Sequence, residues 1–466
     1  MPALSITARL NALPIVRTHR AATAIVGIGV FFDLFDIFLA GVLGTVLSRE
    51  FSLSPIALQA VLASGFVGMF AGAAGLGAFA DRFGRRTAFM VNLAIYSVFT
   101  LAGAFAPNAA WLIAARLIAG VGIGAELPLC DTYLGELLPA KHRGRYTAIA
   151  YTIGFTGVPA VGWLARVLVP IAPLGIAGWR WVFAIGSMGG AIVWMLRSRL
   201  PESPRWLDAA GHHLEAVRVV AAMEAEAPRT SVAHAGAPLA DGGEPGAASF
   251  GTHGTSTRAV RPARVPLKML FSPEYRGRTL MLWVFQAFQA VGYYGFGTIV
   301  PLVLVAKGFS IVTSLTYTSL VFIGYPIGSA LSIPIVERVD RRWLIVASAF
   351  LMAAFGLGLG AAQSPVAIVL LGVGYTMVAN VFSNAFHVLQ AELFPTAVRA
   401  TAAGTAYGLS RLSSAAMPFV LLPLLDRSGA VAAFGAVGLA MVIVMVDVGL
   451  FAPSTTGRSL EDVAGG

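Results

Sequence analysis

The chain has 466 residues, of which 57% are hydrophobic and only 12% are charged, and its formal net charge is +10. Soluble proteins carry about 25% charged residues, so this composition excludes an ordinary soluble enzyme or binding domain and indicates many membrane spans. The positive charge does not indicate a nucleic-acid partner, because the basic residues gather in alternate loops between apolar runs. Cys130 is the only cysteine, which excludes an intrachain disulfide.

Twelve apolar segments are long enough to cross about 30 Å of hydrocarbon as helices. In the first half they lie at 21–47, 57–80, 88–106, 111–133, 146–169 and 180–197. In the second half they lie at 279–305, 314–336, 344–362, 366–390, 400–423 and 429–452. No small-residue cleavage site follows the basic N-terminus at a suitable distance, so the first segment is expected to be retained. The sequence predicts an all-α membrane protein with twelve transmembrane helices.

Loop charge predicts the orientation of these helices. The loops after 106, 169 and 362 contain no Lys or Arg. The loops after the second, fourth, eighth and tenth segments carry Arg82, Arg85, Arg86, Lys141, Arg143, Arg145, Arg338, Arg341, Arg342 and Arg399. Positively charged loops stay in the cytoplasm, so both termini are expected there. The predicted location is the plasma membrane, which is the inner membrane in a bacterium.

One long hydrophilic stretch, 198–278, separates the two sets of helices. Its residues 201–207 begin like a surface helix, whereas 227–265 consist mostly of Ala, Gly, Pro, Ser and Thr. Such a segment buries too little apolar surface to fold alone and is predicted to be a disordered cytoplasmic tether. The predicted domains are therefore an N-terminal six-helix bundle (1–197), a linker (198–278) and a C-terminal six-helix bundle (279–466).

Two motifs occur once in each half with the same offset of 256 residues. The first is Ala-Asp81-Arg82-Phe-Gly84-Arg85-Arg86, repeated as Val-Glu337-Arg338-Val-Asp340-Arg341-Arg342. The second is Glu136-Leu-Leu-Pro139, repeated as Glu392-Leu-Phe-Pro395. A shared offset indicates a duplicated half, which is how many secondary transporters are built. Because the second copy replaces Gly84 by Asp340, we expect its turn to be built differently.

These motifs carry a family resemblance. The segment from Gly77 to Arg86 resembles the loop motif between helices two and three of the major facilitator superfamily, and Arg116-Leu-Ile-Ala-Gly-Val-Gly-Ile-Gly124 resembles its fourth-helix motif. Pro201-Glu-Ser-Pro-Arg205 and Trp179-Arg-Trp181 resemble the sugar-porter and organic-ion branch. The resemblance implies two pseudo-symmetric six-helix bundles around one central site.

A narrower resemblance concerns the substrate. Asp33-Leu-Phe-Asp36 is similar to the paired-aspartate motif of aromatic acid:proton symporters. Gly124-Ala-Glu126-Leu-Pro128, Tyr293-Tyr294-Gly295 and Lys307-Gly-Phe-Ser310 resemble bacterial nicotinate transporters. The resemblance implies a monomeric transporter that imports a small aromatic or organic monocarboxylate with protons by alternating access. Its expected partners are that anion, protons and the lipid bilayer, with no cofactor beyond the proton gradient.

Carboxylates inside the bilayer are costly and indicate function. Asp33 and Asp36 are three residues apart and share one helix face, and two carboxylates this close in a low dielectric resist full ionisation. We expect them, with Glu126 as a second candidate, to couple proton movement to transport. The alternatives are that an aspartate only pairs with an arginine, and that Glu126 only stabilises a broken helix beside Pro128.

Arg411 is the sharpest candidate for substrate binding. It lies near the middle of the predicted helix 400–423, and Tyr407 and Ser414 share its face. A guanidinium there can form two hydrogen bonds with a carboxylate. The alternative is a permanent ion pair between Arg411 and Asp33 or Asp36.

Polar side chains on two other helices complete the expected site. The helix 366–390 carries a stripe of Thr376, Asn380, Asn384 and His387, which should face a wet cavity. The helix 279–305 carries Gln286, Gln289, Tyr293 and Tyr294, and the tyrosines favour a flat aromatic ligand over a sugar. The alternative for all of these is interhelical hydrogen bonding or plain packing.

Charged residues at the cytoplasmic helix ends are expected to act as gates. We expect them to hold the outward-facing state and to separate when the two halves rock. They are Asp81, Arg82, Arg85, Arg86, Arg116, Glu136, Arg143, Glu337, Glu392 and Arg399. The alternative is that they only signal orientation.

The sequence contains no nucleotide-binding loop and no metal-ligand cluster, so no enzyme activity is expected. Three other functions remain open from the sequence: an exporter of small organic molecules in exchange for protons, a sugar porter, and a sensor that hardly transports.

Overall fold

The computed structural model describes residues 5–227, 267–336, 338–394 and 396–453, without the side chains of 74, 77, 78, 81, 267, 391 and 396–400. The proposed tether, except for Ala227, lies outside these residues, as do Glu337 and the side chains of Asp81 and Arg399. Throughout the described ranges the regular secondary structure is helical.

The first half contains the following membrane helices: α2 (Arg17–Glu50), α3 (Pro55–Phe83), α4 (Arg85–Ala104), α5 (Ala109–Gly124), α6 (Glu126–Leu137), α7 (Arg143–Phe155), α8 (Gly157–Ile171) and α9 (Gly178–Arg197). The second half contains α13 (Arg276–Ala290), η4 (Val291–Gly295), α14 (Phe296–Ala306), α15 (Ile311–Phe322), α16 (Gly324–Val336), α17 (Arg341–Ala361), α18 (Pro365–Glu392) and α19 (Thr396–Phe451).

The described residues contain 11 helices that are long and apolar enough to cross a membrane. The last of them, Thr401–Phe451, has 51 residues, about twice the length that one crossing needs. It changes direction at Gly429, whose φ of +79° suits glycine and breaks the helix. The protein therefore has the twelve transmembrane helices that the apolar segments predict.

Three membrane helices are interrupted near their middles, between α5 and α6, α7 and α8, and α15 and α16. The second part of each has a proline as its third residue, at Pro128, Pro159 and Pro326. Proline lacks an N–H group, so the carbonyl four residues earlier loses its helical partner. The sequence thus explains where these helices break.

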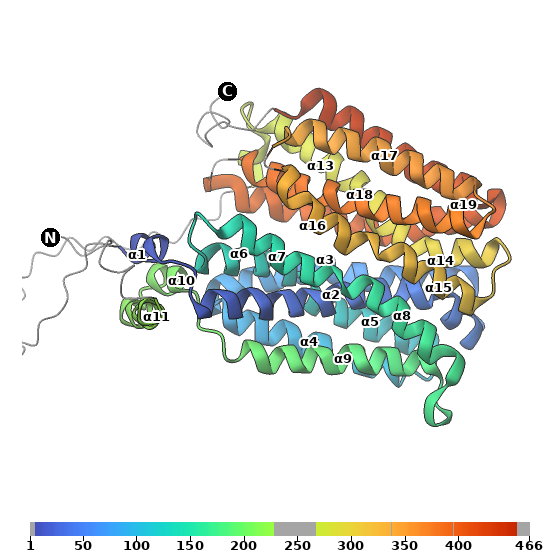
Figure 1. Cartoon of the computed structure of the whole chain (residues 1–466), viewed down its shortest axis with the longest axis horizontal. Coiled ribbons are helices and arrows are strands. Elements are labelled where there is room, and N and C mark those ends of the chain that lie inside the picture. The colour runs from blue at the N-terminus through green and yellow to red at the C-terminus, as the bar shows by residue number, and fades with distance from the viewer. Residues whose placement is uncertain (1–4, 228–266, 337, 395, 454–466) are drawn as a thin grey trace, which may run out of the picture.

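The chain forms two layers of helices in Figure 1, blue to green for the first half and yellow to red for the second. Across the boundary α2 packs on α14, α3 on α19, α7 on α16, and α8 on α15. At two of these contacts glycine is required, because a Cβ at Gly41 would lie 2.9 Å from Thr298 Cα and a Cβ at Gly162 would lie 2.5 Å from Ser319 Oγ.

The repeated loop motif is built differently in the two halves, as its sequences predict. Gly84 joins α3 to α4 with a φ of +98°, a left-handed conformation that glycine adopts readily. Its counterpart Asp340 has a φ of −58° and caps α17, accepting a hydrogen bond from the backbone N–H of Arg342 at 2.9 Å. The substitution exchanges a flexible turn for a side-chain cap.

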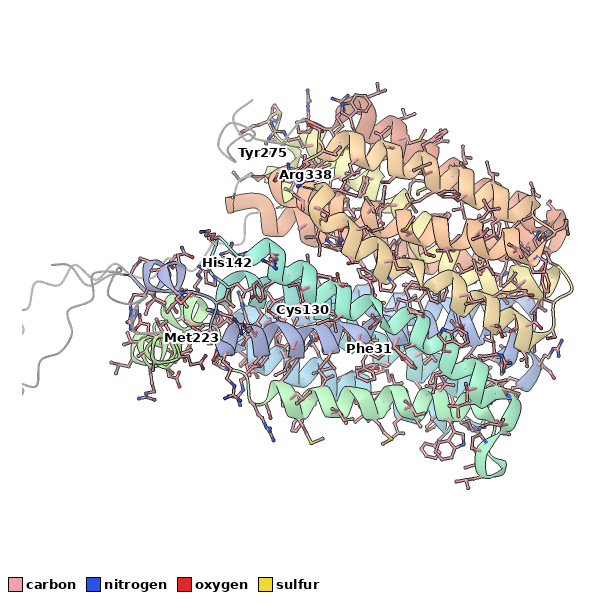
Figure 2. The ribbon with its side chains drawn as sticks, viewed as in Figure 1. Phe31, Cys130, His142, Met223, Tyr275 and Arg338 are labelled. Carbon is pink, nitrogen blue, oxygen red and sulfur yellow. The ribbon has the colours of Figure 1, made fainter. Side chains whose placement is uncertain are left out.

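Short helices lie outside the membrane bundle, at the end from which the N-terminus extends: α1 (Ile6–Ala12), α10 (Pro204–Ala209) and α11 (His213–Ala225) (Figure 1). Met223 of α11 lies among them, whereas Cys130 lies within the first half (Figure 2). The Arg9 guanidinium of α1 pairs with the Glu224 carboxylate of α11 at 2.6 Å. The predicted linker therefore begins with a folded part that packs on the N-terminal segment.

Candidate functional site

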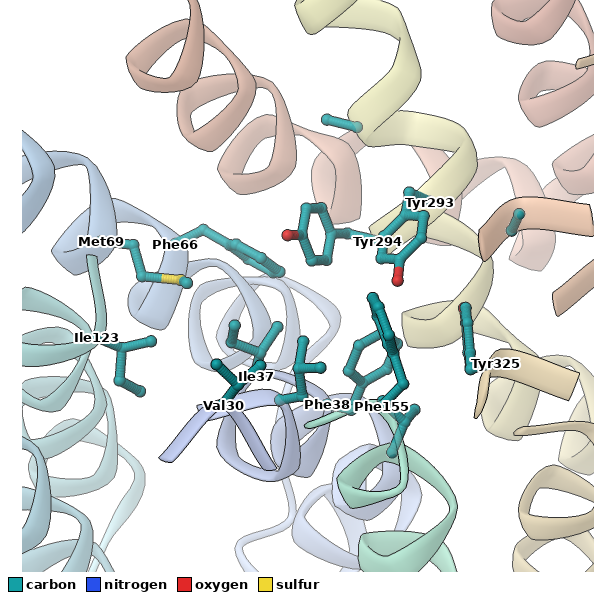
Figure 3. Packing of buried hydrophobic residues seen from close by; sticks show 14 of the residues in the cluster. Val30, Ile37, Phe38, Phe66, Met69, Ile123, Phe155, Tyr293, Tyr294 and Tyr325 are labelled. Atoms are coloured by element: carbon teal, nitrogen blue, oxygen red, sulfur yellow. The ribbon is translucent and has the colours of Figure 1, made fainter. Parts of the chain in front are cut away.

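An aromatic cluster lies where the two halves meet (Figure 3). Phe66 of α3 meets Tyr294 of η4 edge to face, with ring centroids 5.5 Å apart. Phe38 of α2 lies 5.6 Å from Tyr325 of α16, and Tyr325 lies 5.6 Å from Tyr293. Aromatic rings pack well in offset and edge-to-face arrangements. Both halves therefore contribute rings to one aromatic cluster at their boundary.

A single turn of π-helix, η4, places the two tyrosines of the second half. Such turns insert one extra residue into a helix and often occur at functional sites. The rings of Tyr293 and Tyr294 lie 5.1 Å apart, nearly perpendicular. The Tyr293 hydroxyl donates to Asn380 Oδ1 at 2.8 Å, and Asn380 Nδ2 donates to the backbone carbonyl of Tyr325 at 2.5 Å. Tyr293 is thereby held by α18 and α16.

Arg411 of α19 lies against this cluster. Its side chain is only 4% exposed, and its guanidinium lies 5.1 Å from the centroid of the Tyr294 ring. Its Nη1 is buried without a hydrogen-bond partner, which is costly for a charged donor. Arg411 takes part in none of the ion pairs among the described residues. In this structure it therefore does not form the alternative ion pair with Asp33 or Asp36.

Tyr407, one turn from Arg411, contacts His387 of α18. The Tyr407 hydroxyl and His387 Nδ1 are 2.8 Å apart. Ser414, on the other side of Arg411, donates instead to the backbone carbonyl of Ser410 at 2.9 Å. Of the two residues expected to flank Arg411, only Tyr407 therefore reaches a side chain of another helix in this arrangement.

The remaining polar residues form hydrogen bonds within the second half, both between helices and along one helix. Asn384 Nδ2 donates to Ser332 Oγ at 2.5 Å. Gln286 Nε2 donates to Gln390 Oε1 at 2.6 Å, while Gln289 Nε2 donates to Gln286 Oε1 at 2.8 Å. These side chains are neutral, and each forms at least one hydrogen bond, so few of their polar atoms are left without a partner.

Asp36 forms an ion pair within the first half. Its Oδ2 lies 3.7 Å from Arg116 Nη1 of α5, and its Oδ1 accepts a hydrogen bond from Thr100 at 3.2 Å. Arg116 Nη2 also donates to the backbone carbonyl of Asp36 at 3.3 Å. Arg116 is buried inside the bundle and joins α5 to α2, unlike the other predicted gating residues, which lie at helix ends.

Glu126 pairs with Arg197, which sequence reasoning missed. Both side chains are 1% exposed, and Arg197 Nη1 bonds to Glu126 Oε1. Asn92 Nδ2 donates to the other carboxylate oxygen at 3.3 Å, and the Arg197 guanidinium lies 4.1 Å from the Phe89 ring centroid. Arg197 is the last residue of an apolar run, where an arginine is typical of a loop, and only helix packing shows that it points inward.

Asp33 is a buried carboxylate of the first half with an incomplete set of partners. Its side chain is 1% exposed and its Oδ2 has no hydrogen-bond partner. It lies one turn along α2 from Gly29, where a Cβ would collide with the Arg197 guanidinium. Asp33, Asp36 and Glu126 thus share the interior of the first half with two guanidinium groups.

The charged residues at the helix ends that the sequence predicts to be cytoplasmic form ion pairs within each half. Arg85 bonds to Glu136 at 3.0 Å and Arg341 bonds to Glu392 at 3.3 Å. Other predicted gating residues lie nearby: the Arg86 backbone N–H donates to Glu202 Oε2 at 3.1 Å, the Arg82 guanidinium lies over the Phe83 ring, and Arg143 is half-buried. Burial raises the pKa of Glu202 although the backbone N–H groups of Ser203, Arg86 and Arg85 counteract it.

Comparison with known proteins places this arrangement in a family. The family model for sugar (and other) transporters matches residues 22–465. The chain belongs to this family. The transporter is 30% identical over 465 residues to the niacin transporter NiaP of Acinetobacter baylyi, covering 99% of this chain and 100% of that protein. It is 30% identical over 390 residues to a gallate transporter of Pseudomonas putida, covering 83% and 81% of the two chains.

The fold of the transporter matches solved structures. The xylose transporter XylE from E. coli, in a partially occluded inward-open conformation, superimposes with a TM-score of 0.73 at 22% identity, covering 94% of this chain and 99% of that one. The transporter therefore has the major facilitator fold, with twelve transmembrane helices in two six-helix halves. It is a multi-pass membrane protein that moves a small molecule, and it is not an enzyme.

Proposed function

We propose that the transporter imports a small aromatic or organic monocarboxylate, of the nicotinate or benzoate type, together with protons. The observation that carries this proposal is the buried Arg411 guanidinium, which faces the aromatic cluster with Nη1 unpartnered. A carboxylate is the natural partner of such a group, because a guanidinium can donate two parallel hydrogen bonds to it. The unpaired charge is then neutralised only when the substrate is bound.

The ring of the substrate would lie among Tyr294, Phe66 and Tyr293. Apolar and aromatic walls with few polar groups are usual for small-molecule sites. Around this cluster the second half offers neutral hydrogen-bonding groups from Asn380, Asn384, His387, Tyr407, Gln286 and Gln289. These groups suit a ring nitrogen or hydroxyl better than a second charge.

The relatives support this substrate class. One is named for niacin and another for gallate, and both compounds are small aromatic carboxylates. The similarity to both covers most of the chain. It favours the aromatic monocarboxylate over the sugar that the xylose transporter carries, whose likeness at 22% identity concerns the fold.

Proton coupling follows from the balance of charge inside the first half. Asp33, Asp36 and Glu126 face Arg116 and Arg197, so full ionisation would leave one uncompensated negative charge in a low dielectric. Arg116 pairs with Asp36 and Arg197 with Glu126. Asp33 is left as the group that takes a proton from outside and releases it to the cytoplasm.

The transport cycle would be alternating access by rocking of the two halves. The cytoplasmic clusters around Arg85 and Glu136, and around Arg341 and Glu392, would stabilise one state and reorganise in the other. We further propose that both termini lie in the cytoplasm and that the protein works as a monomer in a bacterial inner membrane.

Uptake into proteoliposomes tests the proposal. Radiolabelled nicotinate and benzoate should accumulate when the outside is more acidic than the inside, and a protonophore should abolish the accumulation. If neither compound accumulates, the proposed function is wrong. If an inward proton gradient instead drives these compounds out of the vesicles, the protein is an antiporter.

The variant Asp33→Asn tests the proton site separately. It should abolish gradient-driven accumulation while nicotinate still exchanges between the two sides, because exchange needs no net proton movement. Accumulation that survives in Asp33→Asn would exclude Asp33 as the proton carrier and leave Asp36 and Glu126 as candidates.

A further inference from the structure

One aromatic contact joins the two halves on the cytoplasmic side of Arg411. Tyr151 of α7, in the first half, lies with its ring centroid 6.1 Å from that of His387 of α18, in the second half, and the two rings are tilted by 33°. His387 is five residues from the cytoplasmic end of α18, and Tyr151 is eight residues from the start of α7. The contact therefore lies between the aromatic cluster and the cytoplasm.

Each of these two side chains is held from behind by its own half. The Tyr151 hydroxyl donates to Asp131 Oδ1 of α6 at 2.8 Å. His387 Nδ1 lies 2.8 Å from the Tyr407 hydroxyl of α19. Neither of these hydrogen bonds crosses the boundary, so both can persist when the halves move apart. Between Tyr151 and His387 the boundary is crossed by a ring contact, which can separate with little loss of free energy.

Both side chains also connect to the proposed binding site. Tyr407 lies one turn from Arg411 on the same helix face. On the other side, Tyr151 lies one turn from Phe155, whose ring stacks on Tyr325 with centroids 6.4 Å apart. A substrate held at Arg411 and Tyr325 is therefore separated from His387 by Tyr407 and from Tyr151 by Phe155.

The opposite end of the boundary is built in another way. There the backbones of α2 and α14 approach closely at Gly41 and Thr298, and Arg166 Nε of α8 donates to Thr316 Oγ1 of α15 at 2.7 Å. On the cytoplasmic side the described cross-boundary hydrogen bond near Tyr151 joins Thr152 and Ser329 hydroxyls at 3.1 Å. The cytoplasmic contact is thus carried by side chains, which can separate without moving backbones past one another.

We propose that Tyr151 and His387 form the inner gate of the transporter, with Asp131 and Tyr407 as the residues that position them. The gate closes the path from the aromatic cluster to the cytoplasm when the two rings meet. It opens when the halves separate, and Tyr407 makes its opening sensitive to the occupancy of Arg411. This inference rests on the proposed function only for the identity of the ligand at Arg411.

A pair of cysteines tests the gate directly, because Cys130 is the only native cysteine. In a Cys130→Ala background, Tyr151→Cys and His387→Cys are joined with a short bifunctional thiol reagent that can be cleaved by reduction. Cross-linking should lower nicotinate uptake by at least about tenfold, and reduction should restore it, since a locked inner gate blocks release. Uptake that is unchanged by cross-linking overturns the proposal.

The matched control is the pair Arg166→Cys and Thr316→Cys at the opposite end of the same boundary. If nicotinate loosens the inner gate, it should slow cross-linking of the Tyr151 and His387 pair, without slowing it at the control pair. An equal effect on both pairs would mean that the ligand changes the whole boundary and that these two rings have no special role.

A third cysteine separates failure of the gate from failure of the proposed function. Asn384→Cys lies one turn deeper than His387 on α18, and it should react with an impermeant thiol reagent added from the cytoplasmic side. Cross-linking the gate pair should slow this reaction at least about tenfold. The measurement needs no substrate, so unimpeded labelling rejects the gate even if no carboxylate is transported.

The variant Tyr151→Phe examines the positioning residue Asp131. It keeps the ring and removes the hydroxyl group whose hydrogen bond Asp131 Oδ1 accepts. We expect the maximal uptake rate to fall about threefold or more with little change in the half-saturating concentration, because the gate moves while the site stays intact. A change confined to the half-saturating concentration would make Tyr151 a binding residue and contradict the gate.

Discussion

The two halves of the transporter treat buried charge in opposite ways. The first half encloses three carboxylates and two guanidinium groups, and its arginines are matched to Asp36 and Glu126. The second half places a single charged side chain, Arg411, at the aromatic cluster and surrounds it with neutral amides and hydroxyls. The other buried charge among its described residues, Asp447, lies near the C-terminal end of α19.

This difference suggests how one duplicated fold divides two tasks. A nearly balanced set of charges can exchange a proton without a large change in energy. A lone guanidinium in a neutral setting is instead poised to bind an anion that comes from outside. Four substitutions would break or sharpen the contrast, beginning with the largest expected effect.

Arg197→Ala should destabilise the protein by about 3–5 kcal/mol, because it leaves the Glu126 carboxylate buried without its partner. The measurement is the Tm of the purified protein in detergent. Removing both charges in Arg197→Met with Glu126→Gln should restore much of the loss. If the double variant is no more stable than Arg197→Ala, the pair does not stabilise the first half by mutual compensation.

Arg411→Ala should weaken nicotinate binding by about 10- to 100-fold, the value of about 1.5–3 kcal/mol expected for hydrogen bonds to a charged group. Its Tm should not fall as it does in Arg197→Ala, since no carboxylate is left unpaired. Equilibrium binding in detergent measures the first effect. Arg427→Ala, an exposed position on the same helix, is the matched control and should bind normally. Unchanged binding by Arg411→Ala would remove the basis of the proposed site.

Gln286→Leu should cost about 1–2 kcal/mol of stability, because Gln390 loses a donor and Gln289 loses an acceptor, while both remain neutral. The measurement is again the Tm in detergent. A loss as large as that of Arg197→Ala would show that the neutral network of the second half is as critical as the ionic one of the first.

Arg9→Ala should have the smallest effect, at most about 1 kcal/mol, because the Arg9–Glu224 pair is partly exposed to solvent. High salt should reduce the difference between this variant and the wild type. A large loss of stability, insensitive to salt, would show that the contact between α1 and α11 contributes to the fold as strongly as the buried pairs do.

Features with a local cause could be predicted from the sequence. The apolar run at 88–106 became α4, and the run at 180–197 became α9, with ends shifted by a few residues. The different turns at Gly84 and Asp340 also followed from residue type. The π turn η4 had no such signal, because nothing in Val291–Gly295 distinguishes one extra residue in a turn from an ordinary helix.

The sequence by itself determined the twelve helices, the duplicated architecture and the family, because hydrophobic length and motif spacing are properties of the chain alone. Only the tertiary structure decided the partners of the buried charges. Asp36 meets Arg116 across 80 residues, and Glu126 meets Arg197 across 71. Which arginine reaches which carboxylate depends on how each helix is rotated against its neighbours. That rotation is set by packing, and it leaves Arg411 outside the ion pairs that the described residues form.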